Sequence, residues 1–148
     1  MKEILEKYGK IGIAELVKNY DKLGLRASGN FEKKLEYEVT ESKLKITGAS
    51  YSYFMEKGRG VTSPNKRGKL YGIILQWIED KKLKVWEGKT KKSMAFLISR
   101  KIDEKGIKVP NPYNAGGLIT DVFNRNYFNN LSKELNREIS IKIFNQWQ

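Results

Sequence analysis

Apolar residues recur at helical spacing in several stretches of the chain, and each stretch predicts an amphipathic helix. The predicted helices cover residues 2–24, 69–83, 89–105 and 118–147. In the first helix, Gly9 and Gly12 weaken the middle, and Gly24 is a stop signal. We expect the last helix to be interrupted near residues 124–130. Its second part carries apolar residues four positions apart, which are Leu131, Leu135, Ile139 and Ile143.

After the first helix the pattern changes to strict alternation, which predicts strands. One strand face carries Phe31, Leu35, Tyr37 and Val39. Residues 41–43 form the turn, and Leu44 and Ile46 continue the apolar face on the return strand. The order of helix, hairpin and further helices predicts one α+β domain over residues 1–148. In this domain a small antiparallel sheet, the hairpin around residues 31–47, packs against several helices, and residues 106–148 form a C-terminal extension that ends in a helix.

Residues 51–60 combine an aromatic cluster with a charged loop that contains two glycines. We expect the aromatic side chains to pack a strand or helix end onto the core. The polar and basic residues 61–69 that follow predict an exposed loop. A buried anchor below an exposed cationic loop is typical of a contact surface rather than of a catalytic site.

The composition excludes several kinds of catalytic and metal-binding site, because the chain contains no cysteine and no histidine. Disulfides, zinc–thiolate sites and thiol nucleophiles are thereby excluded, and so is the commonest general base. We therefore expect no enzyme activity, no metal site and no cofactor. Nucleases that bind Mg²⁺ through carboxylates are not excluded, because they need neither cysteine nor histidine. The Glu-x-Lys triplets at residues 32–34 and 41–43, with Asp21 as the one upstream aspartate, carry that alternative.

The net charge of +12 is concentrated in residues 61–112, which hold 13 basic and 5 acidic residues. A local basic surface indicates a nucleic acid or an acidic protein partner, and the contact residues would be Lys57, Lys66, Arg67 and Lys69. Tyr51, Tyr53 and Tyr71 would then stack on bases. In the alternative interpretations, these aromatics are core and the cations are solvated, or the loop contacts a neighbouring subunit. No apolar run is long enough to span a membrane.

The turn, the hairpin and the glycine-containing segment follow one another in a distinctive order. A turn at Ser28 and Gly29 precedes the hairpin, and then Tyr51 and Tyr53 lead into Glu56, Gly58 and Gly60. This order is similar to that of the tail-completion or head–tail joining (neck) proteins of tailed bacteriophages, and the resemblance covers residues 1–105. Arg59 stands where that family often has a small residue.

The resemblance implies a non-enzymatic subunit that is assembled in the host cytoplasm and works as a homo-oligomeric ring in the neck or tail of the virion. Its partners would be other virion proteins, such as portal, connector or tail tube, with non-specific contact to packaged DNA. The subunit interface would use Glu56, Gly58, Arg59, Gly60 and Trp147. The alternatives are a small basic nucleic-acid-binding protein, which includes the Mg²⁺-dependent nuclease, and a host-encoded interaction module.

Overall fold

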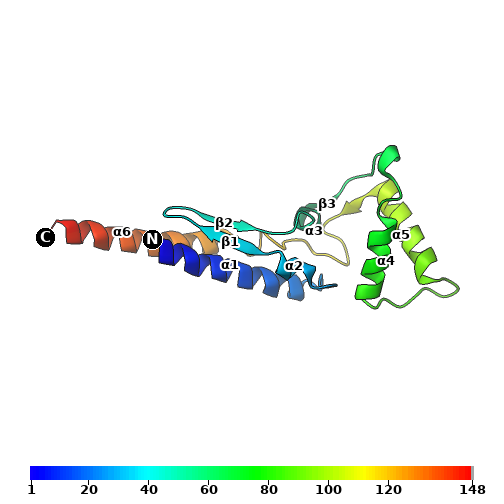
Figure 1. The fold of residues 1–148 in the computed structure, drawn as a ribbon, viewed down its shortest axis with the longest axis horizontal. Helices are drawn as coiled ribbons and strands as arrows, with labels where there is room; N and C mark the ends of the chain where they lie inside the picture. Colours follow the sequence, from blue (N-terminus) through cyan, green and yellow to red (C-terminus); the bar gives the residue numbers. More distant parts are fainter. Residues whose placement is uncertain (148) are drawn as a thin grey trace.

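The computed structural model describes residues 1–147 and has an elongated shape, with one long helix at one end and a helical hairpin at the other (Figure 1). The α+β prediction is confirmed. The elements in chain order are α1 (Lys2–Lys22), α2 (Asn30–Lys33), β1 (Glu36–Val39), β2 (Leu44–Thr47), α3 (Ser52–Lys57), β3 (Gly58–Arg59), the 3₁₀ turn η1 (Pro64–Lys66), α4 (Tyr71–Asp80), α5 (Lys91–Lys105), β4 (Ile107–Lys108) and α6 (Arg125–Gln146).

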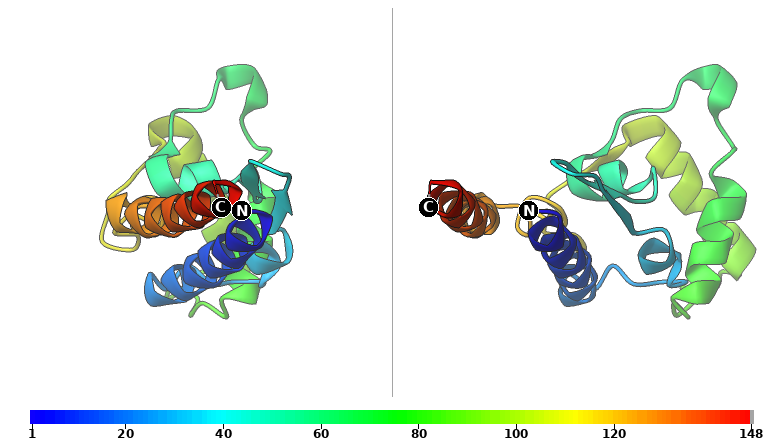
Figure 2. Two further views of the ribbon diagram at one scale, coloured as in Figure 1. Left: turned by 90° about the vertical axis from the view of Figure 1, so that its left-hand side faces the viewer. Right: turned by 60° about the vertical axis from the view of Figure 1, so that its left-hand side comes forward.

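Helix α1 packs against the β1–β2 hairpin, which runs beside it in Figure 1, and Figure 2 shows the fold from two further directions. Strands β1 and β2 pair antiparallel, with Tyr37 opposite Ile46. The predicted alternation is confirmed within these strands, because the even-numbered glutamates of β1 are exposed while Tyr37 and Val39 are partly buried. The hairpin is thus held to α1 by one apolar face.

The two glycines of α1 are the points of closest approach between the helix and its neighbours. A Cβ atom added at Gly9 would lie 2.6 Å from the Tyr37 ring. A Cβ atom at Gly12 would lie 2.9 Å from Ile46 and 3.0 Å from Phe123. Both glycines are buried, so their lower helix propensity is offset by the close packing that they allow.

Phe31 does not belong to a strand, and this part of the predicted hairpin was wrong. It lies in α2, a single helical turn, where it is buried and stacks on Tyr20 with ring centroids 4.4 Å apart. The chain reaches it through Gly29, whose φ of 76° lies in the left-handed region. Leu35 follows just after this turn and packs against the same core, so a helical turn brings the two residues together as well as a strand would.

The interruption predicted near residues 124–130 was also wrong, because α6 runs without a break from residue 125. The Asn124 side chain caps this helix and accepts hydrogen bonds from the N–H groups of Asn126 and Tyr127, at 2.9 and 3.2 Å. The asparagine-rich stretch therefore starts the helix, and residues 118–124 form turns before it.

Two separate groups of buried side chains hold the molecule together. The first joins α1, α2 and the segment before α6 through Tyr20, Phe31 and Leu118. The second lies inside the α4–α5 hairpin, around Ile78 and Met94. Both helices of that hairpin were predicted, with ends a few residues further out. The hairpin thus has its own small core at one end of the molecule.

The segment after α5, which the sequence suggested to be an extension, packs on the body of the molecule before α6 begins. We use the word body for α1, α2, α3 and the β1–β2 hairpin. Leu118 is fully buried, and the Asn19 side chain donates to the carbonyl oxygens of Gly117 and Leu118 at 2.9 and 3.1 Å. The Asn114 side chain donates to the carbonyl oxygen of Met55 at 2.8 Å. Residues 107–124 therefore connect the hairpin, the body and α6. Within residues 1–147, no helix is both long and apolar enough to cross a membrane.

Candidate functional site

Helix α3 buries polar side chains and exposes its aromatic ones, so the expected aromatic anchor was wrong. Tyr53 is 64% exposed and Phe54 is 50% exposed, whereas Ser52 and Glu56 are buried. Ser52 and Glu56 are four residues apart and share the inner face of this short helix, which turns the aromatics outward. Tyr51 is also exposed, and the Lys34 ammonium lies 5.9 Å from the centre of its ring.

Glu56, a predicted interface residue, is bonded within its own chain. Its carboxylate accepts a hydrogen bond from the Ile119 N–H at 2.8 Å and from the Thr120 hydroxyl at 2.7 Å. Burial by itself raises the pKa of Glu56, but these hydrogen bonds outweigh burial and leave the pKa below its ordinary value. Glu56 thus ties α3 to the segment that leads into α6.

Gly58 and Arg59 form β3, which pairs antiparallel with β4 and attaches the α4–α5 hairpin to the body. Gly58 has a φ of 80° and faces the carbonyl oxygen of Ile107 so closely that a Cβ atom would collide with it. Gly106 has a φ of 71° and meets the carbonyl oxygen of Arg59 in the same way. These two glycines are required by the strand pair itself. Gly60, by contrast, is exposed with open space around its Cα.

Arg59 and the loop after it are held by Asp103, a residue that the sequence did not single out. Arg59 donates to the Thr62 hydroxyl at 2.8 Å, and the Thr62 N–H donates to the Asp103 carbonyl oxygen at 2.9 Å. At the other end of the loop, the Gly68 N–H donates to the Asp103 carboxylate at 2.9 Å. Asp103 is 3% exposed, although it lies near the end of α5 among charged residues that look solvated. Both ends of the loop are therefore anchored to α5.

These neighbours also lower the pKa of the Asp103 carboxyl group, although its Oδ1 atom is buried without a hydrogen-bond partner in the part of the chain that the structure describes. The Thr62 side chain and the Gly68 N–H hold the pKa of Asp103 below its ordinary value, with help from the cationic Arg59 and Arg67. The predicted basic contact residues remain on the outside of the loop or beside it, and all are exposed: Lys57, Lys66, Arg67 and Lys69. Among the described residues, none of the four has a carboxylate within ion-pair distance.

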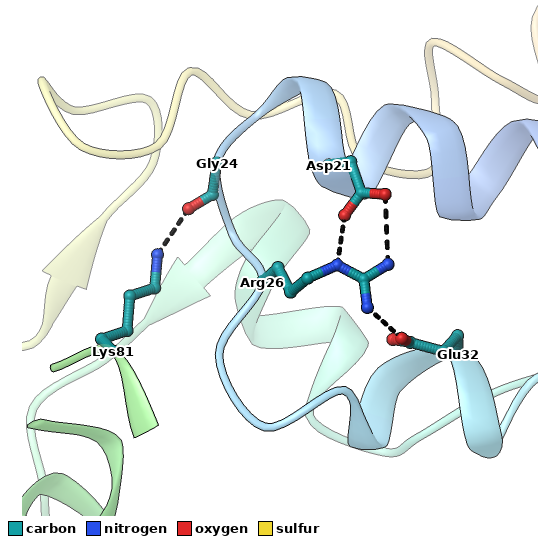
Figure 3. Close-up of polar contacts among 5 residues, drawn as sticks. All are labelled: Asp21, Gly24, Arg26, Glu32 and Lys81. Atoms are coloured by element: carbon teal, nitrogen blue, oxygen red, sulfur yellow. Dashed lines mark hydrogen bonds and ion pairs between the residues drawn. The ribbon is translucent and has the colours of Figure 1, made fainter. Parts of the chain in front are cut away.

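Two carboxylates of the nuclease alternative, Asp21 and Glu32, are paired with an arginine, whereas Glu41 lies exposed in the turn between β1 and β2. Arg26 forms a two-point ion pair with Asp21, at 2.5 and 3.1 Å, and a further ion pair with Glu32 (Figure 3). The hydrogen bond from Arg26 lowers the pKa of Asp21. Within residues 1–147, no three acidic side chains gather in a group that could hold a metal ion. This cluster links the end of α1 to α2 and serves the fold.

The terminal helix α6 divides into a part packed on α1 and a part that projects past it. Leu131 and Leu135 are partly buried, and Glu134 accepts hydrogen bonds from Lys7 at 2.8 Å and from Tyr8 at 3.0 Å. Further along the helix, the amino group of Met1 forms an ion pair with Glu138. Figure 1 shows α6 continuing beyond the N-terminus of α1.

We call residues 139–147 the terminal arm. Its large side chains are exposed, with Phe144 at 64% and Trp147 at 86%, and the others are Ile139, Ile141 and Ile143. The apolar stripe predicted along this helix is thus half covered by α1 and half uncovered. Trp147, a predicted interface residue, makes almost no contact with its own chain. Two further tryptophans, Trp77 and Trp86, are 38% and 50% exposed.

Comparisons with models of protein families, with curated proteins and with solved structures found no match to this chain.

Proposed function

We propose that this chain is a structural protein of a tailed-bacteriophage virion, a head–tail connector or tail-completion subunit that assembles into a ring. The observation that carries the proposal is the terminal arm. A projecting helix that exposes several large apolar side chains together is characteristic of a protein–protein interface. The helical part of the arm extends about 12 Å beyond Glu138 at the usual rise per residue. The order of motifs between Ser28 and Gly60 supplies the phage context.

A second copy of the chain is the occupant that this surface fits best. A complementary apolar surface lies on α4, at the opposite end of the elongated molecule, where Ile73 and Trp77 are exposed one helical turn apart. A contact between two different surfaces on opposite ends of identical subunits propagates from one copy to the next. Such head-to-tail contacts close into a ring when the rotation between subunits allows it.

The test is the mass of the purified protein, measured by native mass spectrometry and analytical ultracentrifugation, with electron microscopy for ring symmetry. We expect a cyclic oligomer for the wild type. Replacing Ile143 and Phe144 with aspartate should give monomers with an unchanged circular dichroism spectrum, because both positions are exposed. The matched control replaces Asn129 and Asn136 with aspartate, which adds the same charge at other exposed positions of α6. The proposal is wrong if the wild-type protein stays monomeric at high concentration and is absent from virions.

The second candidate is a small basic protein whose main activity is nucleic-acid binding. The lysine-rich connection between α4 and α5 favours it. The two candidates differ in assembly, because the second predicts tight DNA binding by a protein that forms no ring. The Mg²⁺-dependent nuclease has less support, since Arg26 occupies Asp21 and Glu32.

A further inference from the structure

The connection between α4 and α5 is the most basic short segment of the chain. We call residues 81–92 the lysine loop, although they include the first two residues of α5. The loop contains a single acidic residue, Glu87, and its lysines are Lys81, Lys82, Lys84, Lys89, Lys91 and Lys92. None of these positions was among the predicted contact residues, which all lie between residues 57 and 69.

The lysine loop points its apolar residues inward and its cations outward. Leu83 packs against the α4–α5 core and Val85 is partly buried, whereas the alternate positions Lys82 and Lys84 are exposed. The lysines at 89, 91 and 92 are exposed as well. Trp86 continues the outward series and is 50% exposed. The loop thus exposes one aromatic ring and five lysines on a single connection.

In the described part of the chain, the exposed lysines of the loop form no ion pairs that would stabilise the fold. Among the described residues, none of the five exposed lysines has a carboxylate within 4.0 Å. Lys81 is the exception in the loop, because it donates to the carbonyl oxygen of Gly24 and fastens the loop to the body (Figure 3). The loop is thus positioned by one lysine while the others remain available for a ligand.

Lys82 occupies a position that strongly favours glycine. It follows the last turn of α4 with a φ of 50°, in the left-handed region. The N–H of Lys82 donates to the Glu79 carbonyl oxygen and the N–H of Leu83 donates to the Ile78 carbonyl oxygen, each at 3.0 Å. This is the Schellman arrangement, in which glycine is the usual residue because it has no Cβ atom. A lysine at a backbone position that favours glycine points to a role for its charge.

We propose that the lysine loop binds the phosphate backbone of nucleic acid without sequence specificity, and that Trp86 stacks on an unpaired base. Exposed lysines without carboxylate partners can pair with phosphates, and the pairing is favourable because it releases the counterions condensed on the nucleic acid. An exposed indole can stack on any base. Insertion into an anionic membrane fits less well, because Leu83 is turned into the protein core and only one large apolar side chain of the loop faces outward. This binding is a property of the single subunit and does not depend on ring assembly.

The test uses the full chain and fluorescence anisotropy of a labelled DNA duplex and a labelled oligothymidine. Between about 50 and 200 mM salt, the logarithm of the affinity for duplex should fall linearly with the logarithm of the salt concentration. The slope should be about −4.5 if all five lysines contact phosphates, and shallower if fewer do. Replacing Lys84, Lys91 and Lys92 with glutamate should weaken binding by about 100-fold or more and flatten the slope by about 3. The control variant makes the same charge change at exposed positions far from the loop, which are Lys2, Lys10 and Lys43.

Two further variants separate binding from folding. Lys82→Gly should raise the thermal midpoint while flattening the salt slope by about 1, since glycine relieves the strain and removes one cation. Trp86→Ala should weaken oligothymidine binding by about 10-fold and leave duplex binding unchanged, because stacking needs an unpaired base. Equal losses in the loop variant and the control would overturn the proposal. Binding to phosphatidylserine vesicles in place of DNA would overturn it too. A monomer that binds DNA as expected would refute the ring and leave this site intact.

Discussion

The replacement of Glu56 by alanine distinguishes a role inside the subunit from a role between subunits. The variant leaves the Ile119 N–H and the Thr120 hydroxyl without their acceptor in a region where Glu56 itself is only 9% exposed. A hydrogen bond to a charged group contributes about 1.5–3 kcal/mol, and the two bonds share one carboxylate, so their losses do not add fully. We therefore expect Glu56→Ala to lower the free energy of unfolding by about 3 kcal/mol, a large part of the roughly 5–15 kcal/mol typical of a domain.

Glu56→Gln is the matched variant, because its amide oxygen can still accept one of the two bonds while the charge is lost. Its expected loss is about half that of the alanine variant. The assay is urea unfolding followed by circular dichroism at neutral pH and at low protein concentration, where association does not contribute. The contrary result is a Glu56→Ala variant that unfolds at the wild-type urea concentration but no longer forms the oligomer. That result would place the carboxylate at a subunit interface.

Three further predictions concern the body, the loop and the terminal helix. Gly9→Ala should lower the free energy of unfolding by about 1–3 kcal/mol through overpacking against Tyr37, whereas Gly72→Ala, with open space around it, should be neutral or stabilising in the same urea experiment. The lowered pKa of Asp103 adds stability above its ordinary pKa that is lost as pH falls, so the thermal midpoint should drop below about pH 4, and less so in Asp103→Asn. Asn124→Ala should destabilise the start of α6 by about 1 kcal/mol, and hydrogen exchange of the first turn should increase.

The sequence alone was sufficient for the features that depend on local periodicity. The apolar positions of α1, α4 and α5 repeat every three to four residues, and the alternation around Tyr37 and Val39 predicted the hairpin. These patterns describe which residues share a face, and a helix or strand forms wherever one face can be covered. The helix ends were less accurate, because a residue that caps a helix, such as Asn124, can also be interpreted as a break in it.

Which partner covers each face depends on contacts between segments that are distant in the chain. The stripe on α6 is continuous in the sequence, yet Leu131 and Leu135 are covered by α1 while Ile139 and Ile143 extend past its end. Glu56 and Asp103 look like surface charges, but donors more than thirty residues away in the chain bury and bond them. Gly9 looks like a weak point in a helix until Tyr37 packs against it. The physical reason is the same in each case: periodicity is local, whereas burial and hydrogen-bond partners are set by segments distant in the sequence.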